Sequence, residues 1–184
     1  MEAVIDRDPF AAIVASVARG DEVAFARLVA AHHDDMARVA YVICGDPDLA
    51  QEAAHAAWPI VWRKVASIRD PSRLGPWLVS VAANEARQLV RRRGRRAVRE
   101  ISVDSDAVGL ATATRRSDPA ERAGEIDLAN SLADLDPTDR TILALRYVGG
   151  LTSQEIGTAI GMTSGGVRAR TARILDRLRR ELHE

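Results

Sequence analysis

A stretch near the carboxyl end of the chain has the residue types that bind nucleic acid. Residues 163–180 contain six arginines and one aspartate. Four of these arginines lie among apolar residues at helical spacing, which leaves them largely free to face outward. They are Arg168, Arg170, Arg173 and Arg177. A guanidinium group can form paired hydrogen bonds with a guanine edge and can neutralise phosphates, so the segment favours DNA recognition.

The residues around these arginines predict a helix-turn-helix that would position them. Thr152 and Glu155 match the Thr-x-x-Glu capping box at the start of a first short helix. Gly161 allows a tight turn, and Thr163 or Ser164 caps the second helix. The buried side of that helix is expected to comprise Val167, Ile174, Leu175 and Leu178. The second helix of such a pair enters the major groove with its amino end first. The alternative is a plain helical hairpin with a basic surface.

A second basic block lies in the middle of the chain, between acidic segments. Residues 91–99 contain six arginines and no acid, whereas residues 100–139 contain ten acids and three arginines. Residues 1–62 are also acidic, with ten acids and four arginines. The formal net charge of zero therefore conceals two basic segments, which either bind nucleic acid or form solvated helix faces.

Residue types for enzymatic or metal chemistry are not arranged at useful spacing. The four histidines do not pair with acids or cysteine at ligand spacing, and neither a glycine-rich phosphate loop nor a nucleophile elbow occurs. The single cysteine, Cys44, excludes a disulfide within the chain. No apolar run reaches the roughly 18 residues that span a bilayer, and residues 1–9 lack the pattern of a signal peptide. The sequence thus predicts a cytoplasmic protein that is not an enzyme and needs no cofactor or metal.

The composition and the apolar spacing predict an all-α protein. Apolar residues make up 47% of the chain and aromatic residues 4%, which favours packed helices. Helices are expected over about 23–44, 47–65 and 77–93, with a loop over 67–76. Asp-Pro occurs five times and is typical of helix starts, because Asp caps free N–H groups and Pro fits the first turn. Pro59, inside the second helix, is expected to kink it.

Two small helical domains joined by a flexible linker are expected. Residues 1–21 form a lead-in, residues 22–96 the first domain, and residues 119–184 the second domain with the helix-turn-helix. The linker covers residues 97–118, where small and polar residues dominate and the apolar period fails. The second domain is expected to begin with an apolar stripe of Leu128, Leu132 and Leu135.

Two segments of the second domain match motifs of a known family. The first consists of Leu132, Leu135, Pro137 and Arg140, close to a Leu-x-x-Leu-Pro-x-x-x-Arg pattern. In the second, residues 155–157 are Glu-Ile-Gly where the family has Glu-Ile-Ala, and residues 165–170 are Gly-Gly-Val-Arg-Ala-Arg where it has Gly-Thr-Val-x-x-Arg. By these motifs the domain resembles the DNA-binding domain of extracytoplasmic-function (ECF) sigma factors, which carry RNA polymerase to promoters. Gly166, in place of the threonine, is expected to loosen the start of the recognition helix.

The first domain resembles the matching domain of the same family. Trp77-Leu78, Ala82 and Asn84, followed by the arginines at 91–93, match the Trp-Leu, Ala-x-Asn and Arg-Arg pattern of its promoter-melting helix. The match is weaker in the polymerase-binding helix. There, His55 stands in place of the usual Gln, and Pro59 interrupts the pattern.

The resemblance implies three sets of site residues. Contacts to the upstream promoter element, in duplex form, are expected from Ser164, Gly165, Arg168, Ala169, Arg170 and Arg173. Contacts to the melted downstream element are expected from Trp77, Asn84, Arg87, Arg91 and Arg92. Docking on core RNA polymerase, through a coiled coil of its largest catalytic subunit, is expected from Glu52, His55, Trp58 and Trp62. Promoter DNA, core polymerase and a separate anti-sigma protein are the partners that the resemblance implies.

Two other functions fit parts of the pattern. One is a helix-turn-helix regulator with a sensory first domain that never needs core polymerase; residues 77–96 argue against it, because a sensor has no reason to carry them. The other is an adaptor that has lost promoter activity. Pro59 and Gly166, which depart from the family pattern, suggest this alternative. Trp58 and Trp62, one turn apart, either pack in the core or contact a partner.

Overall fold

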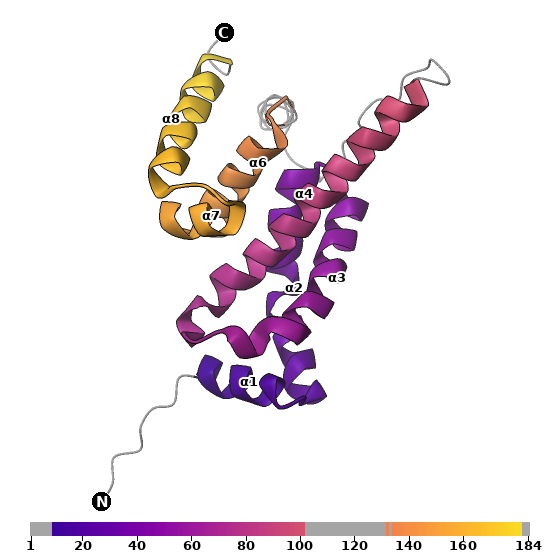
Figure 1. Cartoon of the computed structure of the whole chain (residues 1–184), viewed down its shortest axis with the longest axis vertical. Helices are drawn as coiled ribbons and strands as arrows, with labels where there is room; N and C mark the ends of the chain where they lie inside the picture. Colours follow the sequence, from indigo (N-terminus) through magenta and orange to yellow (C-terminus); the bar gives the residue numbers. More distant parts are fainter. Residues whose placement is uncertain (1–8, 102–131, 133, 182–184) are drawn as a thin grey trace, which may run out of the picture.

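The computed structural model describes residues 9–101, 132 and 134–181, and the regular elements in these residues are all helical. The amino-terminal module consists of α1 (Pro9–Ala18), α2 (Glu22–Cys44), α3 (Pro47–Lys64) and α4 (Leu74–Ile101), with the 3₁₀ turns η1 (Val65–Ser67) and η2 (Pro71–Arg73) between α3 and α4. The carboxyl-terminal module consists of α6 (Pro137–Leu143), the π-helical turn η3 (Ala144–Val148), α7 (Ser153–Ile160) and α8 (Ser164–Glu181). The predicted all-α class is confirmed (Figure 1).

Asp-Pro pairs start helices as the sequence predicts. The Asp46 carboxylate accepts hydrogen bonds from the N–H groups of Asp48 (2.9 Å) and Leu49 (3.2 Å) at the start of α3. Asp70 and Asp136 cap η2 and α6 in the same way. In each case the proline that follows occupies the first turn, where its missing N–H costs nothing. The other two pairs, at 8–9 and 118–119, include residues outside the described part of the chain.

The lead-in expected over residues 1–21 contains a helix that apolar spacing does not reveal. Helix α1 packs on α2 and on the turns η1 and η2, and it buries Val14 and Val17. Its sequence, PFAAIVASVA, is apolar on almost every side, so no amphipathic period marks it. Gly20, at φ 85°, then turns the chain, and Asp21 caps α2.

Helix α4 is longer at both ends than the sequence indicates. It begins at Leu74, inside the expected loop, and it continues through Gly94 to Ile101, past the expected start of the linker at residue 97. One glycine costs a helix only about 1 kcal/mol, and the Arg, Ala and Glu residues that flank it favour the helix. The rest of the expected linker, and Leu128 of the expected apolar stripe, lie outside the described residues.

One apolar core extends across both modules. Helices α2, α3 and α4 pack on one another around large buried side chains such as Leu28, Met36, Ile43, Leu74 and Leu78. The same core cluster includes Ile142, Leu145, Leu151, Ile156 and Val167 from the carboxyl-terminal module. Helix α6 and turn η3 contact α2 and α4, and α7 contacts α4 (Figure 1). A smaller cluster of Leu135, Leu143, Ile174 and Leu178 holds α8 against α6. The two modules therefore pack on each other.

Candidate nucleic-acid and polymerase interfaces

The helix-turn-helix expected from the sequence is formed by α7 and α8. The Thr152 N–H donates to the Glu155 carboxylate at 2.9 Å, and the Glu155 N–H donates to the Thr152 hydroxyl at 3.3 Å. These two bonds complete the predicted capping box. Hydrogen bonds from the hydroxyl and then the N–H of Thr152 hold the pKa of Glu155 below its usual value. The first helix of the pair is therefore fixed at its start.

The turn between α7 and α8 depends on two glycines. Gly161 ends α7 at φ 75°, in the left-handed region that glycine adopts readily. Gly157 lies under the turn, where a Cβ atom would come within 2.5 Å of the Met162 carbonyl oxygen. The Thr163 hydroxyl then accepts the Gly166 N–H at 3.1 Å and caps the start of α8.

The start of α8 presents most of the expected upstream-element residues to solvent. Val167, Ile174 and Leu178 are buried, which fixes the inner face of the helix. The expected contact residues Gly165, Arg168, Ala169 and Arg173 are exposed, and Ser164 is half-buried. Exposed arginines at the amino end of a recognition helix can reach base edges and phosphates in a major groove.

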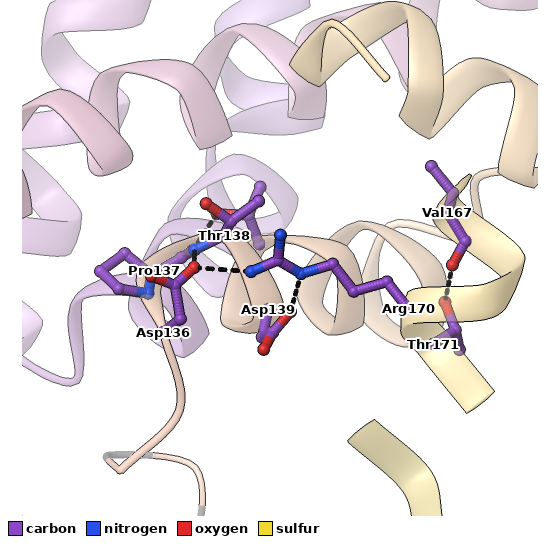
Figure 2. A network of polar contacts seen from close by, with 8 residues as sticks. Asp136, Pro137, Thr138, Asp139, Val167, Arg170 and Thr171 are labelled. Carbon is purple, nitrogen blue, oxygen red and sulfur yellow. Dashed lines mark hydrogen bonds and ion pairs between the residues drawn. The ribbon is translucent and has the colours of Figure 1, made fainter. Parts of the chain in front are cut away.

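Arg170 differs from the outward orientation that the sequence pattern indicates. Its guanidinium extends from α8 to the start of α6, where Nε donates to Asp139 and Nη2 lies 3.1 Å from Asp136 Oδ1 (Figure 2). The Asp136 carboxylate also accepts the Thr138 N–H at 2.8 Å as the cap of α6. Burial acts to raise the pKa of Asp136, but the hydrogen bonds from Thr138 and the charge of Arg170 outweigh it and lower that pKa.

The residues expected to bind the melted downstream element are divided by the packing of the modules. Trp77 and Asn84 are half-buried on α4 and line a groove of about 910 Å³, whose other wall includes residues of α7. Arg91 and Arg92 are exposed further along α4. Arg87 is half-buried, and burial, followed by the nearby charge of Arg91, lowers its pKa. The structure thus brings Trp77 and Asn84 to one groove and leaves Arg91 and Arg92 on the open surface.

The expected polymerase-binding residues of α3 differ in their exposure. Glu52 and His55 are exposed and Trp62 is 37% exposed, but Trp58 is buried, with 6% of its surface exposed. The Phe25 ring packs edge-on against both indoles, at centroid distances of 5.7 Å from Trp58 and 4.8 Å from Trp62. The sequence left open whether these tryptophans pack in the core or contact a partner. Trp58 packs in the core, whereas Trp62 also exposes part of its ring to solvent.

His33 on α2 holds the Trp58 side chain, a contact that the sequence does not reveal. The Trp58 indole N–H donates to His33 Nδ1 at 3.1 Å. The proton of a neutral His33 ring therefore lies on Nε2, which is 2.9 Å from Gln51 Oε1. The rings of His33 and His55 stack at a centroid distance of 5.0 Å. Spacing within α3 gives no sign of this network, because His33 lies 25 residues before Trp58.

Other chemistry is not evident in the part of the chain that the structure describes. Within that part, no three His, Cys, Asp or Glu side chains come together as a metal site. None of the described helices is long and apolar enough to cross a membrane. Cys44 is buried, and this burial raises the pKa of its thiol to about 11, so the thiol is protonated at neutral pH.

Both modules match known protein families. Residues 28–96 match Sigma-70 region 2, and residues 131–180 match Sigma-70, region 4. The chain is 30% identical, over 88% of its length, to the ECF RNA polymerase sigma factor SigE of Mycolicibacterium smegmatis, of which it spans 64%. It is 32% identical, over 74% of its length, to the RNA polymerase sigma factor CarQ of Myxococcus xanthus, of which it spans 76%. The chain belongs to the extracytoplasmic-function sigma factor family.

Solved structures agree with the fold of this sigma factor. The sigma factor RpoE from Bartonella quintana, solved in complex with the anti-sigma factor NepR, is similar with a TM-score of 0.67 and 21% identity, over 86% of this chain and 96% of that one.

The chain spans less than two thirds of the SigE relative, and 42% of a further sigma-factor relative. Sigma-70 region 2 covers α3 with most of α2 and α4, and region 4 covers α6 to α8. The family is not one of enzymes, which confirms that prediction.

Proposed function

We propose that this sigma factor binds core RNA polymerase in the cytoplasm and directs it to specific promoters. The observation that carries the proposal is the exposed amino end of α8, which presents Arg168 and Arg173 from a helix-turn-helix. The same chain exposes Arg91 and Arg92 on α4. One basic surface would read duplex DNA, and the other would hold a melted strand. Transcription from the gene's own upstream region tests the proposal, because purified core polymerase should give a discrete transcript only when the factor is added.

Arg168→Ala is expected to weaken binding of the upstream element by about 1–3 kcal/mol and to relax one base preference. Arg168 is exposed in the second turn of α8, where a side chain can make paired bonds with a guanine edge. Fluorescence anisotropy with the preferred duplex and its single-base variants measures both effects. An equal loss on the preferred duplex and on random duplexes would show that Arg168 contacts phosphate alone.

Helix α3 would supply the docking surface for core polymerase. Glu52 and His55 are exposed on α3, and Trp62 exposes part of its ring near the end of the helix. An acid and a hydrogen-bonding ring near an exposed indole suit a partner surface with basic and apolar groups. Trp58 would act from beneath this surface, because its indole is held by Phe25 and His33.

Pro59→Leu is expected to raise the melting temperature and to leave binding to core polymerase unchanged or stronger. Pro59 is exposed inside α3, and its missing N–H leaves the His55 carbonyl without a helical partner, at a typical cost of ~3 kcal/mol. Helix α3 nevertheless continues to Lys64, and Trp58 is anchored by His33 independently of that bond. Circular dichroism melts and binding to immobilised core polymerase measure the two effects. A variant that stays folded but no longer binds would make the proline part of the docking surface.

The full set of downstream contacts on α4 would form only after the two modules separate, because Arg91 and Arg92 are exposed but Trp77 and Asn84 lie in the groove against α7. Trp77 and Asn84 line the groove that Gln154 and Thr158 of α7 border on the other side. A melted strand bound to Trp77 and Asn84 would therefore displace α7 from α4. A partner that keeps the modules together would inhibit the factor. The complex of the RpoE relative with the anti-sigma factor NepR supports an anti-sigma protein as that partner.

A further inference from the structure

Arg170 has surroundings unlike those of the arginines that flank it on α8. Arg168 and Arg173 are exposed. Neither takes part in the ion pairs found among the described residues. The Arg170 side chain is 31% exposed and is bonded to two carboxylates. Both belong to the start of α6, Asp136 as its cap and Asp139 within its first turn. Figure 2 shows the guanidinium reaching from α8 to these two acids.

We propose that Arg170 is a positioning residue, which sets the angle of α8 against α6 and does not contact DNA. This rests on the proposed function, because α8 is the helix that would enter the major groove. It leaves base and phosphate contacts to Arg168 and Arg173, and it removes Arg170 from the set that would touch the upstream element. Arg170, Asp136 and Asp139 are called the clamp below.

The bonds of the clamp occupy the edge of the guanidinium that carries Nε and Nη2. Nε donates to Asp139, and Nη2 donates to Asp136 at 3.1 Å. That edge is one that arginine uses for paired contacts with carboxylates, phosphates and bases. A phosphate or a guanine that paired with this edge would have to replace Asp139, whose side chain is only 20% exposed. The exchange would also leave two acids close to the DNA backbone, where they would repel it.

Along α8, the ionic hydrogen bonds of the clamp lie between two sets of apolar contacts. Val167 packs in the larger core, whereas Ile174 and Leu178 pack against α6 in the smaller cluster. Arg170 lies between Val167 and Ile174 along α8. Apolar contacts are non-directional and tolerate small rotations, but ionic hydrogen bonds prefer a narrow geometry. The clamp therefore fixes the rotation of α8 and, with it, the direction in which Arg168 points.

Removal of the Asp139 charge is expected to change DNA binding in opposite directions under the two possible roles of Arg170. Removal of an acid beside a DNA-binding surface ordinarily strengthens binding, because repulsion of phosphate falls. If Arg170 positions α8, Asp139→Asn loosens the helix and weakens binding instead. If Arg170 contacts phosphate and Asp139 competes for it, the same substitution frees the arginine and strengthens binding.

The first test measures the affinity of full-length variants for a DNA duplex. The wild-type chain first selects this duplex from a random pool. Asp139→Asn and Arg170→Gln should each weaken binding about tenfold, and the double variant no more than either, because they break one unit. The dependence of log affinity on log salt should keep its slope in these variants. Arg173→Gln, the control for a phosphate contact, should reduce that slope by about 0.9. Tighter binding by Asp139→Asn, or a slope reduced by about 0.9 in Arg170→Gln, would overturn the proposal.

Amide hydrogen exchange on the free chain provides a second test that needs no DNA. Asp139→Asn should speed exchange several-fold in residues 164–173, because the amino-terminal half of α8 loses its ionic support. Unchanged exchange there would overturn the clamp even if the chain binds promoter DNA. A wild-type chain that selects no duplex would refute the proposed function, and the exchange result would still decide whether Arg170 positions α8.

Discussion

Gly157→Val is expected to lower the free energy of unfolding by about 3 kcal/mol, because the turn of the helix-turn-helix passes directly over this residue. A Cβ at Gly157 would lie 2.5 Å from the Met162 carbonyl oxygen and 3.4 Å from the Ser164 nitrogen, both backbone atoms. The Met162 N–H also donates to the Gly157 carbonyl at 2.8 Å, so the turn cannot move away without losing its own bond. Urea denaturation followed by circular dichroism measures the change.

Gly165→Ala is the matched control, because it adds a methyl group where there is room. The nearest atom to a Cβ at Gly165 is 3.9 Å away and belongs to the flexible Arg168 side chain. Alanine favours a helix over glycine, so this variant should be more stable by up to about 1 kcal/mol. A Gly157→Val variant as stable as the wild type would contradict the close approach of α7 to the turn.

Leu145→Ala is expected to destabilise both modules together, by about 2–5 kcal/mol. Leu145 is fully buried in the core cluster that the modules share. The turn η3, which carries it, contacts both α2 and α4. Hydrogen exchange resolved along the chain should therefore become faster in α2 and α4 as well as in α6 and α7.

Leu178→Ala provides the contrast to Leu145→Ala. Leu178 lies in the smaller cluster between α6 and α8, so its truncation should speed exchange only within residues 132–181. If exchange in α2 and α4 stays unchanged in Leu145→Ala, as it should in Leu178→Ala, the two modules unfold independently. The shared core would then have no part in holding them together.

The helix-turn-helix could be predicted closely because its signals are local. The capping box joins Thr152 to a residue three positions away, and Gly161 sets the turn by its own backbone conformation. The Asp-Pro pairs mark helix starts for the same reason. Helix α1 lacks such a signal, since a short segment that is apolar on almost every side shows no period.

The spacing of Arg170 contained a signal for its inward orientation. Arg170 follows Val167 by three positions and precedes Ile174 by four, which is the spacing of a buried helix face. Its partners could not be found in this way, because they lie 31 and 34 residues earlier in the chain. Contacts between the modules have the same limit. Spacing within one helix does not indicate which distant segment will cover it.

Run-off transcription with purified core polymerase, on the gene's own upstream region, tests most directly whether this chain directs initiation. We predict a discrete transcript that requires the factor, and less of it with Arg168→Ala, which is expected to bind the upstream element more weakly. A chain that binds core polymerase yet gives no transcript would indicate an adaptor. A chain that binds the upstream DNA but not core polymerase, and that yields no transcript, would be a regulator that works without core polymerase. That result would contradict the proposed function.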